Sequence, residues 1–530
     1  MLDNMKNEIM KCYENLKDFN GYDLSSDDYY EYDRTGVRLN YENKYFAKRS
    51  CLTARAMYAY LTDKKADEDL IRIINSVCDE FSWVLPAHRP ENPHVDLYSA
   101  ITAHMLCEIA HYIHIPEELH ERIHNIVKVR VKDAYENNAH DWENYKNNWV
   151  PVCAGRVGMM YLYEFPEDFP KVKDRILSGM REYIANFEDD GICSEGIGYW
   201  GFGFGSYLFF AEMLKRVEGT DILKDEKIKA IAKFQQHMFV KNDITASFSD
   251  CSNRKITYGV GLMHFMKKKF GDEIKVPPKK YIGQICNSYD WASVFRNFYW
   301  YDAEIESDDS YFTEEKEQFF GNAQWYINRK NKFALMAKGG NNEELHNHND
   351  VGSFIITDGE HQLISDFGAG EYTKGYSTAD ERYNLFCCSS EGHSVPIIDG
   401  KYQMHGRQYS ANVEKATDDC FCLEMGRAYD IDELTGLRRC FNIKDNSVTL
   451  CDSFNFKNDS HEVVERFISM VEPKKESQYV KIGDMNIKSS CEADISQTDI
   501  TGHHGEKVTL YIIDYRLKSN EFKVEFVLER

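Results

Sequence analysis

A short run containing His346, His348 and Asp350 holds the residues best suited to chemistry in this chain. The three side chains stand at every second position, and an apolar run over 353–357 follows them, which predicts a strand. In an extended backbone, alternate side chains project to the same face. Two imidazoles and a carboxylate on one face can bind a divalent metal ion, act as general acid or base, or do both with different members.

Asp366 and His393 are further candidates for the same site. Each lies at the edge of a short apolar run bounded by glycine, which predicts successive strands of one antiparallel sheet. Two neutral imidazoles and one carboxylate from adjacent strands, with water as the fourth ligand, form a suitable shell for Zn²⁺. Taken singly, Asp366 is better explained as a turn residue at a strand end, and His393 as a half-buried imidazole with satisfied hydrogen bonds.

The elements that must position these residues fall into two halves with different hydrophobic periods. Before residue 305 apolar residues recur at helical spacing, as in the stripe over 97–113, and short loops connect many such segments. These predict antiparallel helices packed in layers or closed into a ring. Later segments such as 448–451, 508–513 and 522–528 alternate with period two, which predicts a large antiparallel sheet or sandwich. We therefore expect an α+β protein with a helical domain over 1–305, a β domain over 306–530 and an acidic linker over 302–317.

Composition excludes several classes of protein. A chain of 530 residues with 42% hydrophobic residues is a folded globular protein, and its length favours two domains. The net charge of −23 argues against nucleic acid and against an anionic membrane surface as partners. No apolar stretch has the length needed to cross a bilayer. A polyanionic substrate remains compatible with this charge if a few arginines dominate locally.

The cysteines and the first residues of the sequence predict a cytoplasmic location. The 15 cysteines are scattered and none has CxxC spacing, which argues against thiolate zinc clusters and against a disulfide framework. The start, 1–8, is charged and lacks the apolar core of a signal peptide, although a secreted chain trimmed of its signal would look the same. The oligomeric state stays open.

Four places in the sequence together resemble the heparinase II/III-like polysaccharide lyases. They are the 147–153 segment, the Glu195–Trp200 segment, the run from His346 to Phe354, and the Asp366 and His393 strands. The resemblance covers most of the chain. It implies an (α/α) toroid followed by an antiparallel β domain, with the active site in the cleft between them. It also implies cleavage of uronate-containing polysaccharides by β-elimination.

The resemblance assigns catalytic roles to Asn148, Tyr199 and His346. A neutral donor, matched by Asn148 with Asn147 beside it, must hold the uronate carboxylate while negative charge accumulates in the transition state. A base must take the C5 proton and an acid must protonate the leaving O4, and Tyr199 and His346 match these two roles in an order that stays open. From spacing alone, the two asparagines are equally a helix N-cap pair, and Tyr199 is equally a packing aromatic.

The same resemblance makes His348, Asp366 and His393 the ligands of one structural Zn²⁺ per chain. Asp350 would then orient the turn or accept a hydrogen bond from a ligand imidazole. The family often carries a histidine directly after the neutralising asparagine, where this chain has Trp149. This difference shifts the acid–base roles to Tyr199 and His346.

We expect an acidic polysaccharide or oligosaccharide as substrate, with glycosaminoglycans ahead of alginate. Arg156 is the first candidate for binding it, followed by Arg254 and Arg382, because guanidinium forks suit carboxylate and sulfate groups. Glu195 is a further substrate-binding candidate. Two other functions remain open: a glycoside hydrolase on a helical toroid, with Glu195 as one of two carboxylates, and a non-catalytic glycan-binding protein.

Overall fold

The computed structural model describes residues 1–17, 19, 23–89, 94–285, 288–308, 316–330, 332–458 and 461–529. Within these ranges the chain forms two compact units. The first unit, which we call the helical unit, comprises Met1–Phe187, Tyr199–Ala232 and Thr257–Ser307. The second, the β unit, comprises Glu188–Gly198, Lys233–Ile256 and Asp308–Arg530. Part of the expected linker, 309–315, lies outside the described residues.

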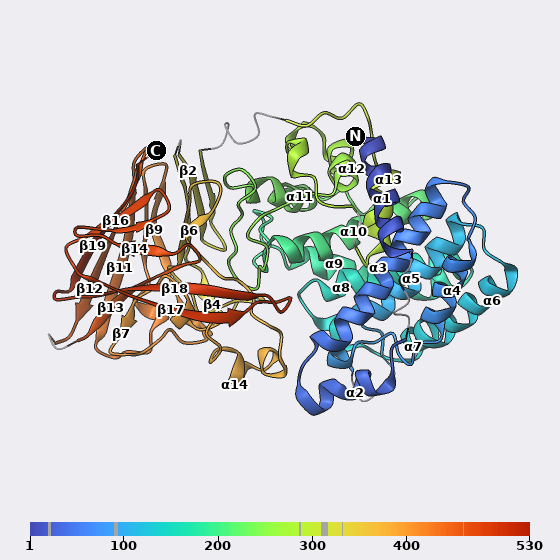
Figure 1. The fold of residues 1–530 in the computed structure, drawn as a ribbon, viewed down its shortest axis with the longest axis horizontal. Helices are drawn as coiled ribbons and strands as arrows, with labels where there is room; N and C mark the ends of the chain where they lie inside the picture. The colour runs from blue at the N-terminus through green and yellow to red at the C-terminus, as the bar shows by residue number, and fades with distance from the viewer. Residues whose placement is uncertain are drawn as a thin grey trace. The chain divides into compact units, whose positions relative to one another are not determined.

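Helices make up the regular structure of the first unit (Figure 1). The predicted helical segments are confirmed, with α5 covering the stripe that begins at Leu97. The last helix, α13, packs against both α12 and α3, so this unit closes on itself. Its helices are α1 (Leu2–Leu16), α2 (Ser26–Thr35), α3 (Leu39–Leu61), α4 (Glu68–Cys78), α5 (Leu97–Tyr112), α6 (Glu117–Val127), α7 (Asp133–Asn137), α8 (Trp149–Glu164), α9 (Phe169–Ala185), α10 (Ile197–Glu218), α11 (Glu226–Met238), α12 (Val260–Phe270) and α13 (Trp291–Tyr299).

Antiparallel sheets make up the β unit, as the period-two segments predict (Figure 1). The strand orders are β1-β2-β3-β5-β6, β14-β15-β16-β19-β12-β11-β10-β9, β17-β18-β13-β7 and β4-β8. A short helix, α14 (Ala379–Arg382), lies in a connection. The strands are β1 (Glu317–Phe320), β2 (Trp325–Arg329), β3 (Ala334–Lys338), β4 (Asn341–Asn342), β5 (Phe354–Thr357), β6 (Gln362–Ile364), β7 (Ile397–Ile398), β8 (Gly406–Ser410), β9 (Asn412–Thr417), β10 (Cys420–Glu424), β11 (Leu434–Ile443), β12 (Ser447–Phe456), β13 (Val463–Ser469), β14 (Pro473–Lys475), β15 (Val480–Ile482), β16 (Met485–Ser489), β17 (Ala493–Thr501), β18 (Lys507–Arg516) and β19 (Glu521–Leu528).

One apolar core joins the sheets of the β unit. Phe354 from β5, Phe441 from β11 and Phe467 from β13 are fully buried in it, and the ring of Phe354 lies 5.1 Å from Phe441 and 5.7 Å from Phe467. Three sheets thus bury their inner faces against one another, because each is apolar on alternate residues. Their loops carry the candidate site described below.

Two segments from the N-terminal half of the sequence belong to the β unit, which differs from a single boundary at 305/306. Hydrogen bonds explain this for the 233–256 segment. Gln362 of β6 donates to the carbonyl of Thr245 at 3.0 Å, and the Ser247 hydroxyl donates to the carbonyl of Asp366 at 2.9 Å. The hydrophobic period of the flanking helices does not reveal such long-range pairing.

A network of buried charges lies inside the helical unit. Glu108 of α5 is fully buried and accepts hydrogen bonds from Arg296 at 2.9 and 3.1 Å, from the Trp291 indole at 2.9 Å and from the Tyr163 hydroxyl at 2.9 Å. Although burial opposes ionisation, Arg296 holds the pKa of Glu108 well below its usual range. The network ties α5, α8 and α13 together.

Replacing Glu108 with Gln should destabilise the helical unit strongly. The substitution keeps the shape of the side chain but leaves Arg296 as an uncompensated buried charge, which costs about 3–5 kcal/mol. Urea unfolding followed by circular dichroism would measure the shift in midpoint. Glu121→Gln, an exposed position on α6, is the matched control and should change stability little. Equal midpoints for the two variants would contradict this role of Glu108.

Candidate active site and metal centre

The run that begins at His346 is a loop and not a strand. β5 begins only at Phe354, and His346 has a φ of +56°, a left-handed conformation that is costly for a residue with a side chain. The Ser353 N–H donates to the carbonyl of Asp350 at 2.9 Å and closes a turn. The prediction of one extended backbone with three side chains on one face is therefore wrong. Hydrogen bonds to the rest of the unit set the direction of each side chain instead.

Asp250 brings the two histidines of this loop together. Its Oδ2 accepts from Nδ1 of His346 at 2.8 Å, and its Oδ1 accepts from Nε2 of His348 at 2.9 Å. The backbone N–H of Asp250 also donates to the carbonyl of His346 at 3.0 Å. Asp250 is fully buried, so one carboxylate fixes the orientation of both imidazoles. The left-handed turn at His346 is held in place by these contacts.

Two further groups donate hydrogen bonds to the buried Asp250 carboxylate. The Tyr376 hydroxyl donates to Oδ1 at 2.5 Å, and Nη2 of Arg382 donates to the same oxygen at 2.9 Å. Burial raises the pKa of Asp250, but Arg382 and the two imidazoles outweigh it and hold that pKa well below its usual range. Asp250 is therefore ionised and acts as a charged acceptor.

The predicted metal ligands His348, Asp366 and His393 lie together. One ligand atom from each falls within 4.8 Å of the others, and all three side chains are buried. The sequence predicted that Asp366 and His393 lie on strands of one sheet, which is wrong. Asp366 follows β6 of the five-stranded sheet, while His393 precedes β7 of the four-stranded sheet. Burial raises the pKa of Asp366 and lowers that of His393, but their contact at 3.2 Å outweighs both effects: His393 lowers the pKa of Asp366, and Asp366 raises the pKa of His393.

The hydrogen bonds of the two imidazoles leave suitable lone pairs for a metal ion. Nε2 of His348 faces the Asp250 carboxylate, and Nε2 of His393 faces the carbonyl of Cys387 at 3.0 Å. Because these oxygens only accept, Nε2 is the donor in both rings and Nδ1 is the ligand atom. Nδ1 of His348 is buried and has no hydrogen-bond partner among the described residues. These residues fit a divalent metal ion.

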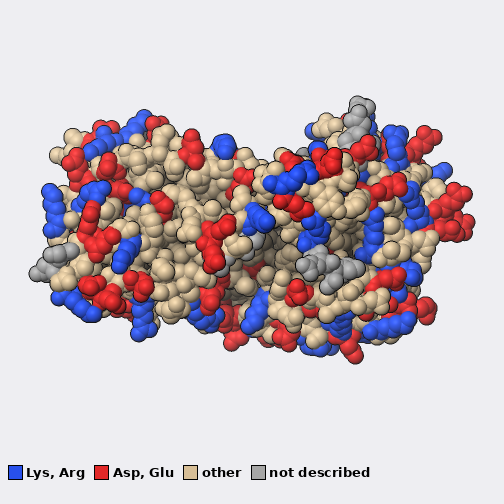
Figure 2. All heavy atoms as spheres, turned by 90° about the horizontal axis from the view of Figure 1, so that it is seen from below, with Lys and Arg blue, Asp and Glu red and all other residues tan. Residues whose placement is uncertain are grey.

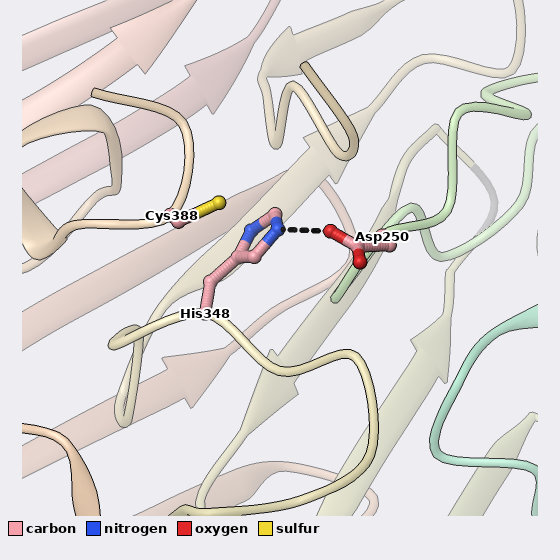
Figure 3. Close-up of side chains that lie close together, drawn as sticks. All are labelled: Asp250, His348 and Cys388. Atoms are coloured by element: carbon pink, nitrogen blue, oxygen red, sulfur yellow. Dashed lines mark hydrogen bonds and ion pairs between the residues drawn. The ribbon is translucent and has the colours of Figure 1, made fainter. Parts of the chain in front are cut away.

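A second group, Asp250, His348 and Cys388, also has ligand atoms within 4.8 Å of one another. Figure 3 shows that Asp250 and Cys388 lie on opposite sides of the His348 ring, with Asp250 hydrogen-bonded to it. In this group the Nε2 atom of His348 already faces Asp250, so the ring nitrogen that remains for a metal ion is Nδ1. Of the two roles expected for Asp350, the structure shows the one in the turn, which its carbonyl closes, while its Oδ1 accepts from the buried ammonium of Lys338 at 2.7 Å.

His346 lies between two carboxylates. Its Nε2 is 3.4 Å from Oε2 of Glu195, opposite the bond from Nδ1 to Asp250. Gly196, with a φ of +98°, allows Glu195 to come this close, because a Cβ at Gly196 would lie 2.8 Å from the Cβ of Cys251. Although burial opposes it, Asp250 and Glu195 raise the pKa of His346. About a quarter of the His346 side chain, 24%, remains exposed.

In the helical unit, Asn148 lies against α10, the helix that carries Tyr199. Asn148 is buried at the start of α8 and makes no side-chain capping hydrogen bond, whereas Asn147 accepts from the Trp149 N–H at 3.1 Å. A Cβ at Gly203 of α10 would lie 2.9 Å from the Cβ of Asn148. Tyr199 is four residues before Gly203 on α10, hence on the same face of that helix. Asn148 is thus the N-cap residue of α8 by position, while the side-chain bond to the first turn comes from Asn147.

The expectation for Arg156 is wrong. Its side chain is 1% exposed, and Nη2 donates to Asp290 at 2.8 Å and to the Ser206 hydroxyl at 3.3 Å. The position lies two turns after Asn148 on α8, a helix that is buried along most of its length. Arg156 therefore stabilises the interior of the helical unit and is not available to bind substrate.

The other two arginines have local partners in the β unit. Arg382 donates to Asp250 and also to the carbonyl of Asn347 at 3.0 Å. It therefore supports the loop over 346–353, which we call the histidine loop. Arg254 donates to the carbonyl of Phe367 at 3.0 Å and is half-buried. Neither guanidinium is fully buried, and Arg254 forms no ion pair with a carboxylate in the described part of the chain.

Residues 313–474 match the model of the heparinase II/III-like C-terminal domain. The histidine loop, Asp366 and His393 all lie within this range. This stretch of the chain is therefore similar to the C-terminal domain of heparinase II/III-like proteins. No curated protein sequence matches the chain.

Solved structures support the heparinase II/III-like fold over nearly the whole chain. The structure titled heparinase III has a TM-score of 0.65 at 14% identity, covering 96% of this chain and 79% of that chain. The heparan sulfate lyase HepC from Pedobacter heparinus has a TM-score of 0.56 at 13% identity, covering 99% and 88%. The chondroitin AC lyase of Streptomyces coelicolor A3 with chondroitin sulphate has a TM-score of 0.53 at 9% identity, covering 100% and 83%.

Sequence reasoning missed Asp250, although it links the two predicted residues His346 and His348. Asp250 is 96 residues from His346 and lies between α11 and α12. The available signal was weak: a polar segment, Ser247 to Asn253, interrupts the helical period there. It also missed Arg439 of β11, which is fully buried and donates to the carbonyls of Gly352 and Ser394 at 2.9 Å, next to the two ligand segments.

Purified protein should contain about one divalent metal ion per chain, and His348→Ala should lose it. Because binding energy at such a site contributes to folding, metal content and melting temperature should fall together. Elemental analysis and thermal unfolding measure both. His361→Ala, an exposed position between β5 and β6, is the matched control and should keep the metal.

Cys388→Ser decides between the two groups that share His348. If His348, Asp366 and His393 hold the ion, this variant keeps its metal. Loss of metal from Cys388→Ser but not from Asp366→Asn would contradict the predicted ligand set.

Proposed function

We propose that this protein is a lyase that cleaves uronate-containing acidic glycans by β-elimination and leaves unsaturated uronate ends. Glycosaminoglycans are the first substrate class and alginate is the second. The observation that carries the proposal is the His346 loop. The buried Asp250 aligns the partly exposed imidazole of His346 beside the candidate metal ligands, and this imidazole lies in the stretch that is similar to the heparinase II/III-like domain. The solved heparan sulfate and chondroitin lyases support this substrate class.

Asn148 and Tyr199 supply the remaining groups that the elimination requires. The C5 proton of a uronate becomes acidic only when a neutral donor holds the neighbouring carboxylate as charge accumulates. The Asn148 side-chain amide is such a donor and is not used to cap α8. Tyr199, half-buried on the same side of α10 as Gly203, provides a hydroxyl for proton transfer.

We assign base and acid from the surroundings of His346. Both of its ring nitrogens face carboxylate oxygens, those of Asp250 and Glu195, and such oxygens only accept. This arrangement favours an imidazole that donates protons. His346 therefore serves as the acid that protonates the leaving O4, and Tyr199 serves as the base that takes the C5 proton.

We propose Zn²⁺ as the ion of the His348, Asp366 and His393 triad. Two imidazole nitrogens and one carboxylate oxygen suit this ion, and the buried position suits a structural role. Bound there, the ion would hold the loop after β6 and the segment before β7 against the histidine loop. The chemistry of the elimination itself is left to the side chains of this chain.

A polyanionic substrate must overcome the net charge of −23. On the face drawn in Figure 2, basic and acidic side chains are interspersed. Binding must therefore come from a few local donors, of which Arg254 is the remaining predicted arginine, with Asn147 beside Asn148. Short oligosaccharides, which carry less charge than polymers, are the favoured substrates.

A glycoside hydrolase is less well supported, because it needs two carboxylates at the scissile bond. Asp250, the carboxylate opposite Glu195 across His346, is fully buried and saturated with donors. A cytoplasmic location stays our proposal, supported by twelve free cysteines among the described residues. No described helix has the length and apolarity to span a membrane.

Incubation with defined heparan sulfate, chondroitin, hyaluronan and alginate oligomers tests the proposal. A lyase produces an ultraviolet-absorbing unsaturated end on at least one of them. New reducing ends without this absorbance would show a hydrolase, and binding without products would show a glycan-binding protein. Either result would overturn the proposed function.

Tyr199→Phe should reduce turnover by at least ~10²-fold, the usual contribution of general acid–base catalysis. The substitution keeps the ring and its packing and removes the proton-transfer group. Steady-state kinetics on the best oligomer measure the loss, and thermal unfolding confirms the fold. Tyr145→Phe, an exposed tyrosine of the same unit, is the control. Full activity of Tyr199→Phe would remove this residue from the mechanism.

Asp250→Asn should lower kcat by roughly 10–100-fold, as changes to groups that orient ligands and imidazoles do. Asparagine offers one acceptor oxygen, so it cannot accept from both His346 and His348. We expect kcat to fall more than KM rises, because Asp250 positions a catalytic group and does not touch substrate. Asp380→Asn, an exposed aspartate of α14, is the matched control. Unchanged kcat in Asp250→Asn would end this positioning role.

A further inference from the structure

Cysteines form a row across three neighbouring strands of the eight-stranded sheet, far along the chain from the histidine loop (Figure 1). Cys422 of β10 pairs directly with Cys440 of β11, and Cys440 pairs directly with Cys451 of β12. Cys420 lies two residues before Cys422 on the same strand and thus on the same face. We call these four residues the cysteine row.

The cysteine row lies on the face of the sheet that points away from the core. Its strand neighbours Phe421, Phe441 and Leu450 are fully buried in the core of the β unit, so the alternate residues face outward. Three sulfurs are nevertheless shielded: Cys420 is 7%, Cys422 3% and Cys440 5% exposed. Cys451 is only half-buried, which makes it the most accessible member of the row.

One disulfide already joins two members of the row, which cysteine spacing in the sequence did not indicate. Cys422 and Cys440 form this bond, and Sγ of Cys420 lies 3.6 Å from Sγ of Cys422. Cys420 and Cys451 are free thiols. A disulfide with a free thiol beside each partner has the parts that thiol–disulfide exchange requires.

A lysine lies next to the cysteine row at each of its two ends. Lys415 of β9 is paired with Cys422, and Lys523 of β19 is paired with Cys451. Burial raises the pKa of Cys451; the charge of Lys523 opposes this rise, while Asp452 and Glu521 add to it. A nearby ammonium stabilises the thiolate, the form that attacks a disulfide. The ammonium of Lys523 also attracts small anionic thiols to Cys451, the exposed end of the row.

We propose that the cysteine row is a thiol–disulfide exchange site for low-molecular-weight thiols and disulfides, with Cys451 as its point of entry. The proposal is independent of the lyase function. In the internal step, the Cys451 thiolate attacks Sγ of Cys440. The Cys440–Cys451 bond forms, the Cys422–Cys440 bond breaks, and Cys422 leaves as a thiolate without net oxidation or reduction.

The external steps then use two small thiols. The first thiolate attacks Sγ of Cys451, forms a mixed disulfide there and releases the Cys440 thiolate. The second attacks the sulfur of the bound small thiol, which leaves as a small-molecule disulfide while Cys451 is released as a thiolate. The protein disulfide is thereby reduced to two thiols, and two small thiols are oxidised to one disulfide. The reverse sequence reoxidises the row.

Glutathione in defined ratios of its reduced and oxidised forms tests the proposal on the full chain. After acid quenching and alkylation, peptide mass spectrometry identifies each disulfide. We expect a Cys440–Cys451 disulfide beside the Cys422–Cys440 disulfide, and a glutathione adduct at Cys451. Cys451→Ser should slow reduction of the Cys422–Cys440 disulfide at least ~10-fold, because attack must then occur at a shielded sulfur.

Cys491→Ser is the matched control, since Cys491 is an equally half-buried free cysteine outside the row. It should leave the reduction rate and the disulfide pattern unchanged. Circular dichroism of both variants confirms that each is folded. The proposal is overturned if Cys451→Ser reduces as fast as the wild type. It is also overturned if no Cys440–Cys451 disulfide forms at any ratio, or if glutathione adds equally at Cys451 and Cys491.

Discussion

The buried carboxylate of Asp250 is the constraint on which the candidate site depends. A fully buried charge is stable only when donors surround it, and here they come from segments far apart in the sequence. Satisfying Asp250 therefore fixes His346, His348, Tyr376 and Arg382 at once. The same bonds hold His346 in a left-handed conformation that its own backbone disfavours. The imidazole proposed for catalysis and an imidazole proposed as metal ligand thus share one acceptor.

Similar buried charges specify the surroundings of this site. Arg439 lies in the core of the β unit, where it pairs with Asp452 at 2.6 Å and Glu465 at 2.9 Å. Its remaining donors hold the backbone at Gly352 and Ser394, beside the histidine loop and His393. Lys338 of β3 and Asp350 form another fully buried pair. Such pairs add little net stability over apolar packing, so we attribute to them the fixing of loop geometry.

Strands and loops have different roles in the β unit. Strands with alternating apolar residues supply a rigid core, and the loops at their ends carry the polar groups. The metal-type triad joins a loop of the five-stranded sheet to a segment before a strand of the four-stranded sheet. On the outer face of the eight-stranded sheet, the cysteine row is positioned by strand register alone. The candidate metal ligands and the cysteine row therefore depend on different sheets of the β unit.

By itself, the sequence determined the fold class and the change from helices to strands, and its resemblance to a known lyase family implied the grouping of His348, Asp366 and His393. Hydrophobic period and motif composition are local, and they survive folding because each element buries its apolar face. Only the tertiary structure decided that the histidine run is a loop, that Asp250 joins it and that Arg156 is buried. These outcomes depend on hydrogen bonds across long sequence separations, such as the 96 residues from Asp250 to His346. No local spacing encodes such a bond, since a buried charge selects its partners only after distant segments have packed together.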